Sequence, residues 1–497
     1  MELIKNLTYG FSVATTSHNL MYCLIGALLG TVVGVLPGMN PVIVISMLLA
    51  LTFKIPAVGA LIMLAGIYYG SHHSGATTAI MLNMPGEPSS LVVCLDGHPM
   101  ARQGRAGPAL CISALASFFA GSCAVLLIAL FAPPIAQAAL QFQAPEYTAV
   151  VVLALVGSSA LSDKSLFSTL GMAALGVLIG TIGTDVNTGV MRFTFGFDQL
   201  DQGVDFVAVA VGLFAFTEIS IRLGSPQVHG YIEAKFKGLV PKLSDLRSSW
   251  KPILRGTAIG GIFGIMPGTG PLISSFASYA VERKLAADPS RFGNGAIEGV
   301  AGPEAADNAA ALTHFIPMLT LGIPAGATMA LLLGAMLIQG IQPGPEVMTS
   351  HPDLFWGLIA SMWLGNLMLL VINLPLVGIW IKLLQTPYRF LYPMILVFSC
   401  IGIYGIRNES FDIILAVITA AGGYVLRRLD CPPAPLILGL ILGPILEENF
   451  RRSLLISRGD PTIFVMRPIS LGIIILTIVL VVVLTLPALR RKTVKSS

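Results

Sequence analysis

Long apolar stretches separated by short polar segments run along most of the chain. A helix needs about 20 apolar residues to cross a hydrocarbon core of roughly 30 Å. Backbone groups inside a bilayer must pair with one another, so such stretches favour helices. The stretches that approach this length lie at 108–131, 145–161, 166–183, 204–221, 354–381, 391–406, 411–426, 433–446 and 468–488. The pattern predicts an all-α polytopic membrane protein with about 10–12 transmembrane helices.

Two further apolar regions, 20–95 and 256–345, are interrupted by Gly and Pro every few residues. Proline removes a backbone donor and glycine relaxes helical restraint, so these sequences do not continue a regular helix. An unpaired backbone group in lipid costs several kcal/mol, so a break survives only inside protein or beside a wet cavity. We therefore predict broken helices or re-entrant hairpins in both regions.

The two interrupted regions share a spaced pattern of Gly and Pro, which indicates an internal repeat. Each position of the pattern recurs 230 residues later, as Gly30 does at Gly260. The pattern comprises Gly26, Gly30, Gly34, Pro37, Gly38 and Pro41, then Gly256, Gly260, Gly264, Pro267, Gly268 and Pro271. A second break follows each copy, at 83–88 and 320–325. Transporter repeats with paired broken helices are often of inverted topology, so we predict two inverted repeats.

The glycine steps also have a simpler interpretation, because glycines four residues apart form close-packing faces between membrane helices. We interpret the steps themselves as packing faces and the Pro–Gly pairs as functional breaks, since packing needs no proline. The predicted broken-helix motifs are Gly34, Pro37, Gly38, Pro41, Gly264, Pro267, Gly268 and Pro271.

Basic residues gather between apolar stretches and set the predicted orientation. They fill the segment around 235–255, end the chain at 490–495 and follow the first broken region at His98, Arg102 and Arg105. Cytoplasmic loops carry the excess of Lys and Arg, so we place all three on the cytoplasmic side. We expect a first transmembrane repeat at 1–222, a cytoplasmic basic linker at 223–255, a second repeat at 256–430, and C-terminal transmembrane helices with a basic cytoplasmic tail at 431–497.

Composition supports the membrane class and excludes several others. Of 497 residues, 55% are hydrophobic and only 11% are charged, whereas a soluble domain carries about 25% charged residues. The net charge of +4 comes without a basic patch interleaved with aromatics, so we expect no nucleic-acid partner. The six cysteines lack metal-ligand spacing, and no catalytic or Walker A motif is present, so we predict no metal, no cofactor and no enzymatic activity.

Polar clusters inside the interrupted regions are the candidate site, because ionisable residues within a membrane are costly and mark pathways. Broken helices offer N–H groups and a positive dipole end to an anion, and free carbonyls to a cation. We assign substrate binding to Ser71, Thr77, Thr78, Asn83, Pro85, Gly86, Gly322 and Pro324. We assign cation binding to Glu304, Asp307 and Asn308. We expect the breaks at 83–86 and 322–324 to form hairpin tips that meet near the membrane midplane.

Three polar residues near the site keep a second interpretation. Glu298 follows Arg291 closely and is equally well explained as part of a solvated loop. The pair His72 and His73 has no third or fourth ligand at useful spacing, which favours a substrate or packing role over a metal site.

Several longer motifs resemble the large membrane subunit of the tripartite tricarboxylate transporters. They include Asn-Met-Pro-Gly-Glu-Pro at 83–88, Asp-Gly-His-Pro-Met-Ala at 96–101 and Gly-Pro-Glu-Ala-Ala-Asp-Asn-Ala at 302–309. Further matches lie at 30–41, 65–70, 104–107, 264–271, 320–324, 434–439, 442–444 and 447–449. The chain departs from the family pattern at His73 and Met84, which leaves the identity of the acid open.

The resemblance implies a secondary transporter of the bacterial inner membrane, driven by a Na⁺ or H⁺ gradient and importing citrate or a related organic acid. It also implies two partners, a small four-helix membrane subunit and a periplasmic solute-binding protein; a dimer stays open. An elevator-type movement follows only by analogy with other carboxylate carriers. The alternatives are a passive organic-anion channel and a carrier that needs no binding protein. A non-transporting scaffold is disfavoured because it would not need polar breaks.

Overall fold

The computed structural model describes residues 2–36, 39–157, 165–185, 188–222, 240–266, 270–383 and 388–495. Four residues of the predicted broken motifs, Pro37, Gly38, Pro267 and Gly268, lie outside this part, as does most of the predicted linker. The described residues form helices throughout, apart from the short antiparallel pair β1 (Gly183–Thr184) and β2 (Met191–Arg192). The predicted all-α class is therefore confirmed.

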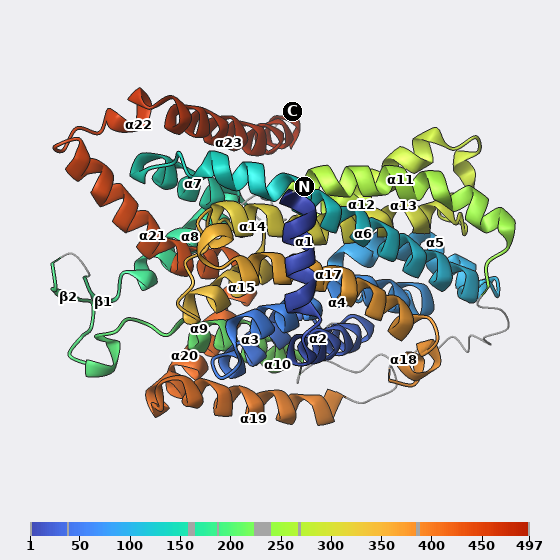
Figure 1. The fold of residues 1–497 in the computed structure, drawn as a ribbon, viewed down its shortest axis with the longest axis horizontal. Helices are drawn as coiled ribbons and strands as arrows, with labels where there is room; N and C mark the ends of the chain where they lie inside the picture. Colours follow the sequence, from blue (N-terminus) through green and yellow to red (C-terminus); the bar gives the residue numbers. More distant parts are fainter. Residues whose placement is uncertain are drawn as a thin grey trace.

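Helices follow one another closely along the first half of the chain, as Figure 1 shows. Their order is α1 (Glu2–Ala14), α2 (Ser17–Val35), α3 (Pro41–Thr52), α4 (Ala57–Leu82), the 3₁₀ turn η1 (Pro88–Ser90), α5 (Leu91–Arg102), α6 (Ala106–Ala139), α7 (Ala144–Gly157), α8 (Leu166–Gly180), the 3₁₀ turn η3 (Asp198–Leu200), α9 (Phe206–Ala210), the π-helix η4 (Val211–Phe216) and α10 (Thr217–Arg222).

The second half continues in the same way. It contains α11 (Leu243–Ile265), α12 (Gly270–Leu285), the 3₁₀ turn η5 (Pro289–Arg291), α13 (Glu298–Thr313), α14 (Phe315–Leu321), α15 (Ala327–Ile338), α16 (Val347–Ser350), α17 (Pro352–Asn373), α18 (Val377–Leu383), α19 (Tyr388–Arg407), α20 (Ser410–Arg428), α21 (Ala434–Ile456), α22 (Ile463–Met466) and α23 (Pro468–Lys495).

The structure corrects two of the predictions about helices and loops. The stretch predicted at 354–381 is divided, because α17 ends at Asn373 and α18 begins at Val377. The prediction that His98 and Arg102 lie in a loop is wrong, because both residues lie on α5. The helix forms there because Leu91 to Arg102 buries Val92, Val93 and Met100 against the neighbouring helices.

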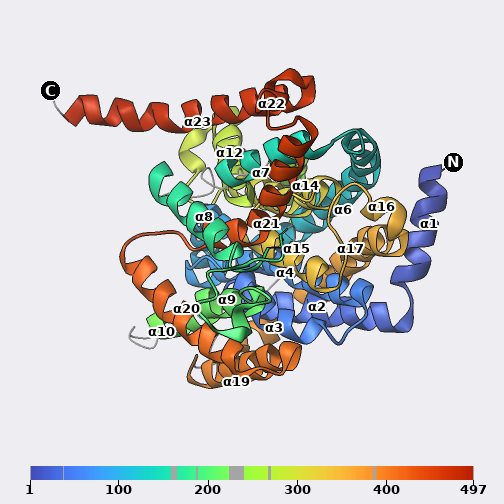
Figure 2. The same cartoon turned by 90° about the vertical axis from the view of Figure 1, so that its left-hand side faces the viewer.

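Four described helices are long and apolar enough to cross a membrane: Ser17–Val35, Ala106–Ala139, Pro352–Asn373 and Ser410–Arg428. Large apolar side chains on outer helices are exposed, such as Ile418 on α20 and Leu476 on α23. The two helices α19 and α23 run along opposite sides of the molecule in both views (Figures 1 and 2). An exposed apolar belt of this kind suits lipid, and the chain is a multi-pass membrane protein.

Glycine steps bring two pairs of helices into backbone contact. A Cβ on Gly30 of α2 would lie 2.7 Å from the Ile67 carbonyl oxygen of α4. A Cβ on Gly260 of α11 would lie 2.2 Å from the Ala306 carbonyl oxygen of α13. Small residues allow membrane helices to approach closely, so both sets of glycines are packing faces. Through these faces α2 packs against α4 and α11 packs against α13, and α4 and α13 are the two helices that carry the predicted polar clusters.

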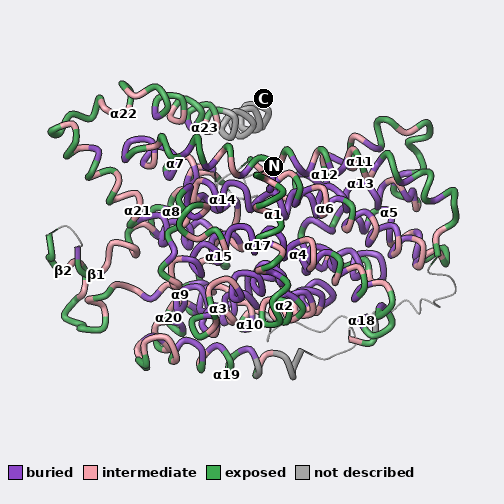
Figure 3. The backbone as a smooth tube through the Cα atoms, in the orientation of Figure 1, coloured by how far each residue is buried: buried purple, intermediate pink, exposed green. Residues whose placement is uncertain are grey.

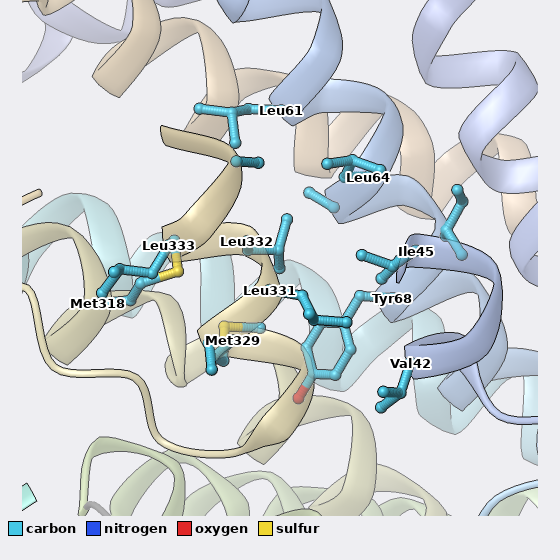
Figure 4. Packing of buried hydrophobic residues seen from close by; sticks show 14 of the residues in the cluster. Val42, Ile45, Leu61, Leu64, Tyr68, Met318, Met329, Leu331, Leu332 and Leu333 are labelled. Carbon is cyan, nitrogen blue, oxygen red and sulfur yellow. The ribbon is translucent and has the colours of Figure 1, made fainter. Parts of the chain in front are cut away.

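Burial is concentrated in the middle of the molecule, where α4, α13, α14 and α15 lie (Figure 3). Every residue of α13 after Glu298 is buried. Figure 4 shows Tyr68 of α4 among Val42 of α3 and Leu331 of α15. Apolar side chains from neighbouring helices thus pack against α4 beside its polar residues.

Candidate functional site

The first break begins where α4 ends in a left-handed residue, Asn83, with a φ of 56°. The chain then folds back, and the Gly86 N–H points at the Gly75 carbonyl of the same helix at 3.4 Å. A Cβ on Gly86 would lie 2.1 Å from the Gly34 carbonyl oxygen and 2.7 Å from the Thr78 hydroxyl. Only glycine fits at this position, because any side chain would push the break off α2 and α4.

Glu87 follows as the N-terminal cap of η1 and is buried, with 4% of its surface exposed. Its backbone N–H donates to the Ser90 hydroxyl at 3.2 Å, and that hydroxyl donates to the Glu87 carbonyl at 2.8 Å. Oε1 of Glu87 has no hydrogen-bond partner among the described residues. Sequence analysis included Glu87 in the 83–88 motif without assigning it a role.

The second break also begins with a residue in the left-handed region, Gly322, but it packs against a different segment of the chain. Gly322 caps α14 with a φ of 69°, and a Cβ there would lie 2.9 Å from the Pro343 carbonyl oxygen. Gly322 therefore faces the 342–344 segment, and Pro324 is buried nearby in the chain before α15 begins at Ala327. The structure records no contact between these residues and Gly86, so the predicted meeting of the two tips stays a prediction.

A cavity of about 400 Å³ joins the first break to the region that follows the second. Ala327 lines it at the N-terminus of α15, Ala434 at the N-terminus of α21, and Asn40 as the cap of α3. Arg427 of α20 also lines it and pairs with Glu218 at 3.4 Å, while over half of its side chain stays exposed. The full lining is Met39, Asn40, Val42, Ile43, Pro85, Gly86, Glu87, Pro88, Leu213, Phe214, Glu218, Ala327, Arg427, Pro433 and Ala434.

Charged groups of both signs line this cavity, namely the carboxylates of Glu87 and Glu218 and the guanidinium of Arg427. Three helices begin at this cavity, and a helix N-terminus carries partial positive charge. At α3 the first residue is Pro41, which has no N–H, and the Val42 N–H already donates to the Asn40 side chain at 3.0 Å. Arg427 adds a full positive charge with a fork of donors that matches a carboxylate.

The predicted substrate residues divide into two groups in the structure. Pro85 and Gly86 line the cavity. Thr77 and Thr78 are buried on α4. The Thr78 hydroxyl donates to the Gly34 carbonyl at 3.1 Å, and both of these groups lie against Gly86 of the break. Ser71 donates to the Tyr68 carbonyl at 2.8 Å within its own helix.

Asn83 is exposed, and neither it nor Ser71 is among the described residues that line the cavity. The structure thus brings only part of the predicted substrate set to one place.

The predicted cation residues are buried together on α13. Asp307 pairs through Oδ1 with Nδ1 of His72 on α4, 3.0 Å away. Glu304 accepts from Ser117 of α6 at 2.8 Å and from Asn308 at 3.1 Å through Oε1. The remaining oxygens, Oδ2 of Asp307 and Oε2 of Glu304, have no partner in the part of the chain described here. These residues face one another across α4, α6 and α13 as a connected polar group.

Two more histidines adjoin this group. His314, at the end of α13, contacts the Tyr68 hydroxyl through Nδ1 at 3.1 Å, and its Nε2 is unpartnered within the described ranges. His73 is buried with neither ring nitrogen bonded to a described residue. Within those same ranges no group of three or more His, Cys, Asp or Glu side chains is arranged to hold a metal ion.

Glu298 lies apart from the buried group. It begins α13 and pairs with Arg291 at 3.2 Å, with 19% of its side chain exposed. Glu298 is therefore a partly exposed helix residue outside the buried group, and not part of a loop.

Residues that the sequence did not single out complete the geometry. Arg427 lies at the end of a predicted span, where a basic residue usually marks only the membrane boundary. Ser117 lies inside the uniformly apolar stretch 108–131, and its approach to Glu304 spans 187 residues of sequence. The position of Glu87 inside a Pro-flanked break was the one available signal.

A second, larger cavity of about 740 Å³ lies between α7, α8, α21 and α23. Aliphatic and aromatic side chains such as Val152, Phe450 and Ile478 dominate its lining. Burying a charged acid there would cost several kcal/mol without a paired cation, so this cavity does not suit the substrate.

Comparison with known proteins connects this geometry to one family. The model of the tripartite tricarboxylate transporter TctA family matches residues 20–438. An Agrobacterium vitis protein described as "Uncharacterized 52.8 kDa protein in TAR-I ttuC' 3'region" is 51% identical over 99% of this chain and 98% of its own length. A second protein of that organism, "Uncharacterized protein in TAR-II ttuC' 3'region", is 55% identical over 47% of this chain and 96% of its own length. No solved structure matches. The chain belongs to the tripartite tricarboxylate transporter TctA family, a family of transporters and not of enzymes.

Proposed function

We propose that the chain is the large transmembrane subunit of a secondary transporter that imports a tricarboxylate or related organic acid. An ion gradient drives import, a periplasmic solute-binding protein delivers the acid, and a small four-helix membrane subunit completes the assembly in the bacterial inner membrane. The C-terminus lies in the cytoplasm. Family membership supports the transport class, and the finer features extend the resemblance described above.

The observation that carries the proposal is the 400 Å³ cavity beside the first break. It combines the guanidinium of Arg427 with the N-termini of α15 and α21, which favour a carboxylate group, and its lining also includes Glu87 and Glu218. In this proposal Arg427 leaves Glu218 to bind a substrate carboxylate. The two inverted repeats and their hairpins supply the movement that exposes the cavity to each side in turn.

The test is uptake of labelled citrate and of a panel of other di- and tricarboxylates into proteoliposomes that hold this chain and its small partner subunit. The binding protein is added or omitted, and Na⁺ and proton gradients are imposed separately. Uptake that needs both the binding protein and one gradient supports the proposal. Downhill flux that needs neither supports a passive channel, and gradient-driven uptake without the binding protein supports an independent carrier.

The cavity itself is tested by Arg427→Gln. Loss of a charge-assisted contact of about 1.5–3 kcal/mol should raise the KM for uptake at least about tenfold. Arg428→Gln is the matched control, because Arg428 bonds to Tyr424 one turn earlier and does not line the cavity. An equal effect of both substitutions on KM would place the acid elsewhere.

A further inference from the structure

Five titratable side chains form a buried acid–imidazole cluster: His72, Glu87, Glu304, Asp307 and His314. Each is at least nine-tenths buried, and they come from α4, the start of η1 and α13. Burying ionisable groups inside a membrane protein is costly, so a cluster of this size needs a function. The elements α4, η1 and α13 contact one another directly, so the cluster lies in one region of the molecule.

Part of the hydrogen-bonding capacity of the cluster is unused. Oε1 of Glu87, Oε2 of Glu304, Oδ2 of Asp307 and Nε2 of His314 lack partners among the described residues. Buried polar atoms in proteins are nearly always bonded, and exceptions call for a specific explanation such as a transient ion or proton. The open atoms therefore leave the cluster able to accept or donate further hydrogen bonds.

Glu87 connects the cluster with the proposed substrate cavity. It lines that cavity, and Ser89, two residues later in η1, lies 3.4 Å from Nδ1 of His72. The His72 side chain keeps 8% of its surface exposed, whereas Asp307 keeps 1%. A path of titratable groups thus leads from the cavity through Glu87 to His72 and then to Asp307.

We propose that a proton is the coupling ion and that the His72–Asp307 pair carries it, with Glu87 as the link to the substrate cavity. The inference rests on the proposed transport function and names its driving ion. In the unloaded state the Nδ1–H of His72 donates to Asp307, and Nε2 is free of a proton. Loading transfers one proton from water on the entry side to Nε2, which forms an N–H bond and an imidazolium beside the carboxylate. Unloading returns that proton to water on the exit side.

The donor set favours a proton over Na⁺. A hard cation such as Na⁺ prefers to be surrounded by oxygen ligands. Here Oδ1 of Asp307 is already hydrogen-bonded to an imidazole nitrogen, Nδ1 of His72. Histidine is the side chain whose charge changes most readily near neutral pH. The added positive charge also offsets one negative charge of an acid that enters the cavity beside Glu87, which ties proton loading to substrate loading.

The groups around the His72–Asp307 pair are titratable or polar side chains of the neighbouring elements. On α4 the Tyr68 ring lies edge-on to the His72 ring at 4.8 Å, and on η1 the Ser89 hydroxyl lies 3.4 Å from Nδ1 of His72. Tyr68 also contacts His314 at 3.1 Å, while Glu304 lies one turn before Asp307 on α13 and His73 is buried next to His72 on α4. Arg255 of α11 and Glu282 of α12 pair with each other, and Asp96 of α5 is bonded to the loop before α13. The contact of α6 with the cluster is made by the uncharged Ser117. No described lysine or arginine reaches His72 to fix its charge.

The first test uses the wild-type complex and needs no substitution. Proteoliposomes with the partner subunit and binding protein receive labelled citrate, or the acid of the panel that is transported, at a pH where that acid is fully ionised. A pH-sensitive dye in the lumen should report acidification that follows uptake. A one-unit pH gradient without Na⁺ should raise accumulation about tenfold per coupled proton, since each 1.4 kcal/mol is a factor of ten.

The second test uses His72→Gln and Asp307→Asn, with the exposed His18→Gln as the control. Both cluster variants should lower the ratio of pH-driven accumulation to gradient-free exchange of labelled for unlabelled acid by about tenfold or more. The His18→Gln ratio should equal that of the wild type. A merely structural defect would lower accumulation and exchange together and leave the ratio unchanged.

Two outcomes separate this inference from the function on which it rests. Normal exchange with accumulation driven by Na⁺ alone, and no lumenal acidification, would overturn proton coupling and leave the transport function intact. Absence of binding-protein-dependent exchange for every acid tested would overturn the transport function and the coupling inference with it.

Discussion

Two buried carboxylate regions of this protein differ in how completely their oxygens are bonded. Asp96 of α5 is fully buried, and its Oδ1 accepts from the backbone N–H groups of Gly293, Gly295 and Ala296 at 2.8–2.9 Å. Its Oδ2 accepts from the Tyr279 hydroxyl at 2.9 Å. The acid–imidazole cluster, in contrast, keeps an unbonded oxygen on each of its three carboxylates within the described chain.

The difference separates a structural carboxylate from one suited to change its state. Both carboxylate oxygens of Asp96 accept hydrogen bonds. These bonds connect α5, in the first half of the chain, to the loop that leads into α13. Gly293 and Gly295 have φ values of 85° and 100°, which aim successive N–H groups at one oxygen. A saturated carboxylate of this kind holds α13 in place, whereas the open oxygens on α13 itself leave room for a proton or ion.

Removing the saturated carboxylate should have the largest effect on stability. Asp96→Ala leaves three backbone donors and a tyrosine hydroxyl without their acceptor, so we expect the free energy of unfolding to fall by about 3–5 kcal/mol. Asp96→Asn keeps an oxygen for the N–H groups and should cost about 1 kcal/mol. Unfolding in detergent measures both, with the exposed Asp198→Asn as the control. Equal stability of Asp96→Ala and the control would remove the distinction between the two regions.

Displacing Glu87 from the cluster should abolish uptake while costing less stability. Gly86→Ala places a methyl group 2.1 Å from the Gly34 carbonyl oxygen, so the break must move and carry Glu87 with it. We expect uptake to fall at least about tenfold, with protein still present in the membrane. Gly472→Ala on α23 is the matched control, because a Cβ there meets nothing within 4 Å. Wild-type uptake by Gly86→Ala would show that the position of the break does not matter.

The helices themselves were largely predictable from the sequence, because apolar length and Gly/Pro spacing are local signals. The stretch predicted at 411–426 is α20 (Ser410–Arg428), and the stretch at 166–183 is α8 (Leu166–Gly180). The burial of Asp307 and Asn308 also followed from their place before an apolar run. These features depend on neighbouring residues alone.

The partners of the polar residues were not predictable, because they come from distant parts of the chain. His72 and Asp307 are 235 residues apart in sequence, and Asp96 and Ala296 are 200 apart. Nothing local distinguishes Asp96, which binds backbone, from Asp307, which retains an open oxygen. The placement of the predicted substrate residues was hard to predict for the same reason: Asn83 is polar and lies at the break, but its side chain is exposed.

The smallest expected effect concerns acid sensitivity of the loop that carries the donors to Asp96. Asp288 caps η5 in that loop, and bonds from the Ser290 hydroxyl and backbone N–H hold the pKa of Asp288 below its usual value of 3.8. A lowered folded-state pKa contributes stability above the unfolded pKa, and this contribution is lost as the pH falls through the folded pKa, below 3.8. Asp288→Asn should therefore melt slightly below the wild type at about pH 7, with the gap closing toward about pH 3. Ser290→Ala removes one of the two donors and should reproduce part of the gap. A gap that stayed constant over this range would mean that Asp288 supports the loop by its shape and not by its charge.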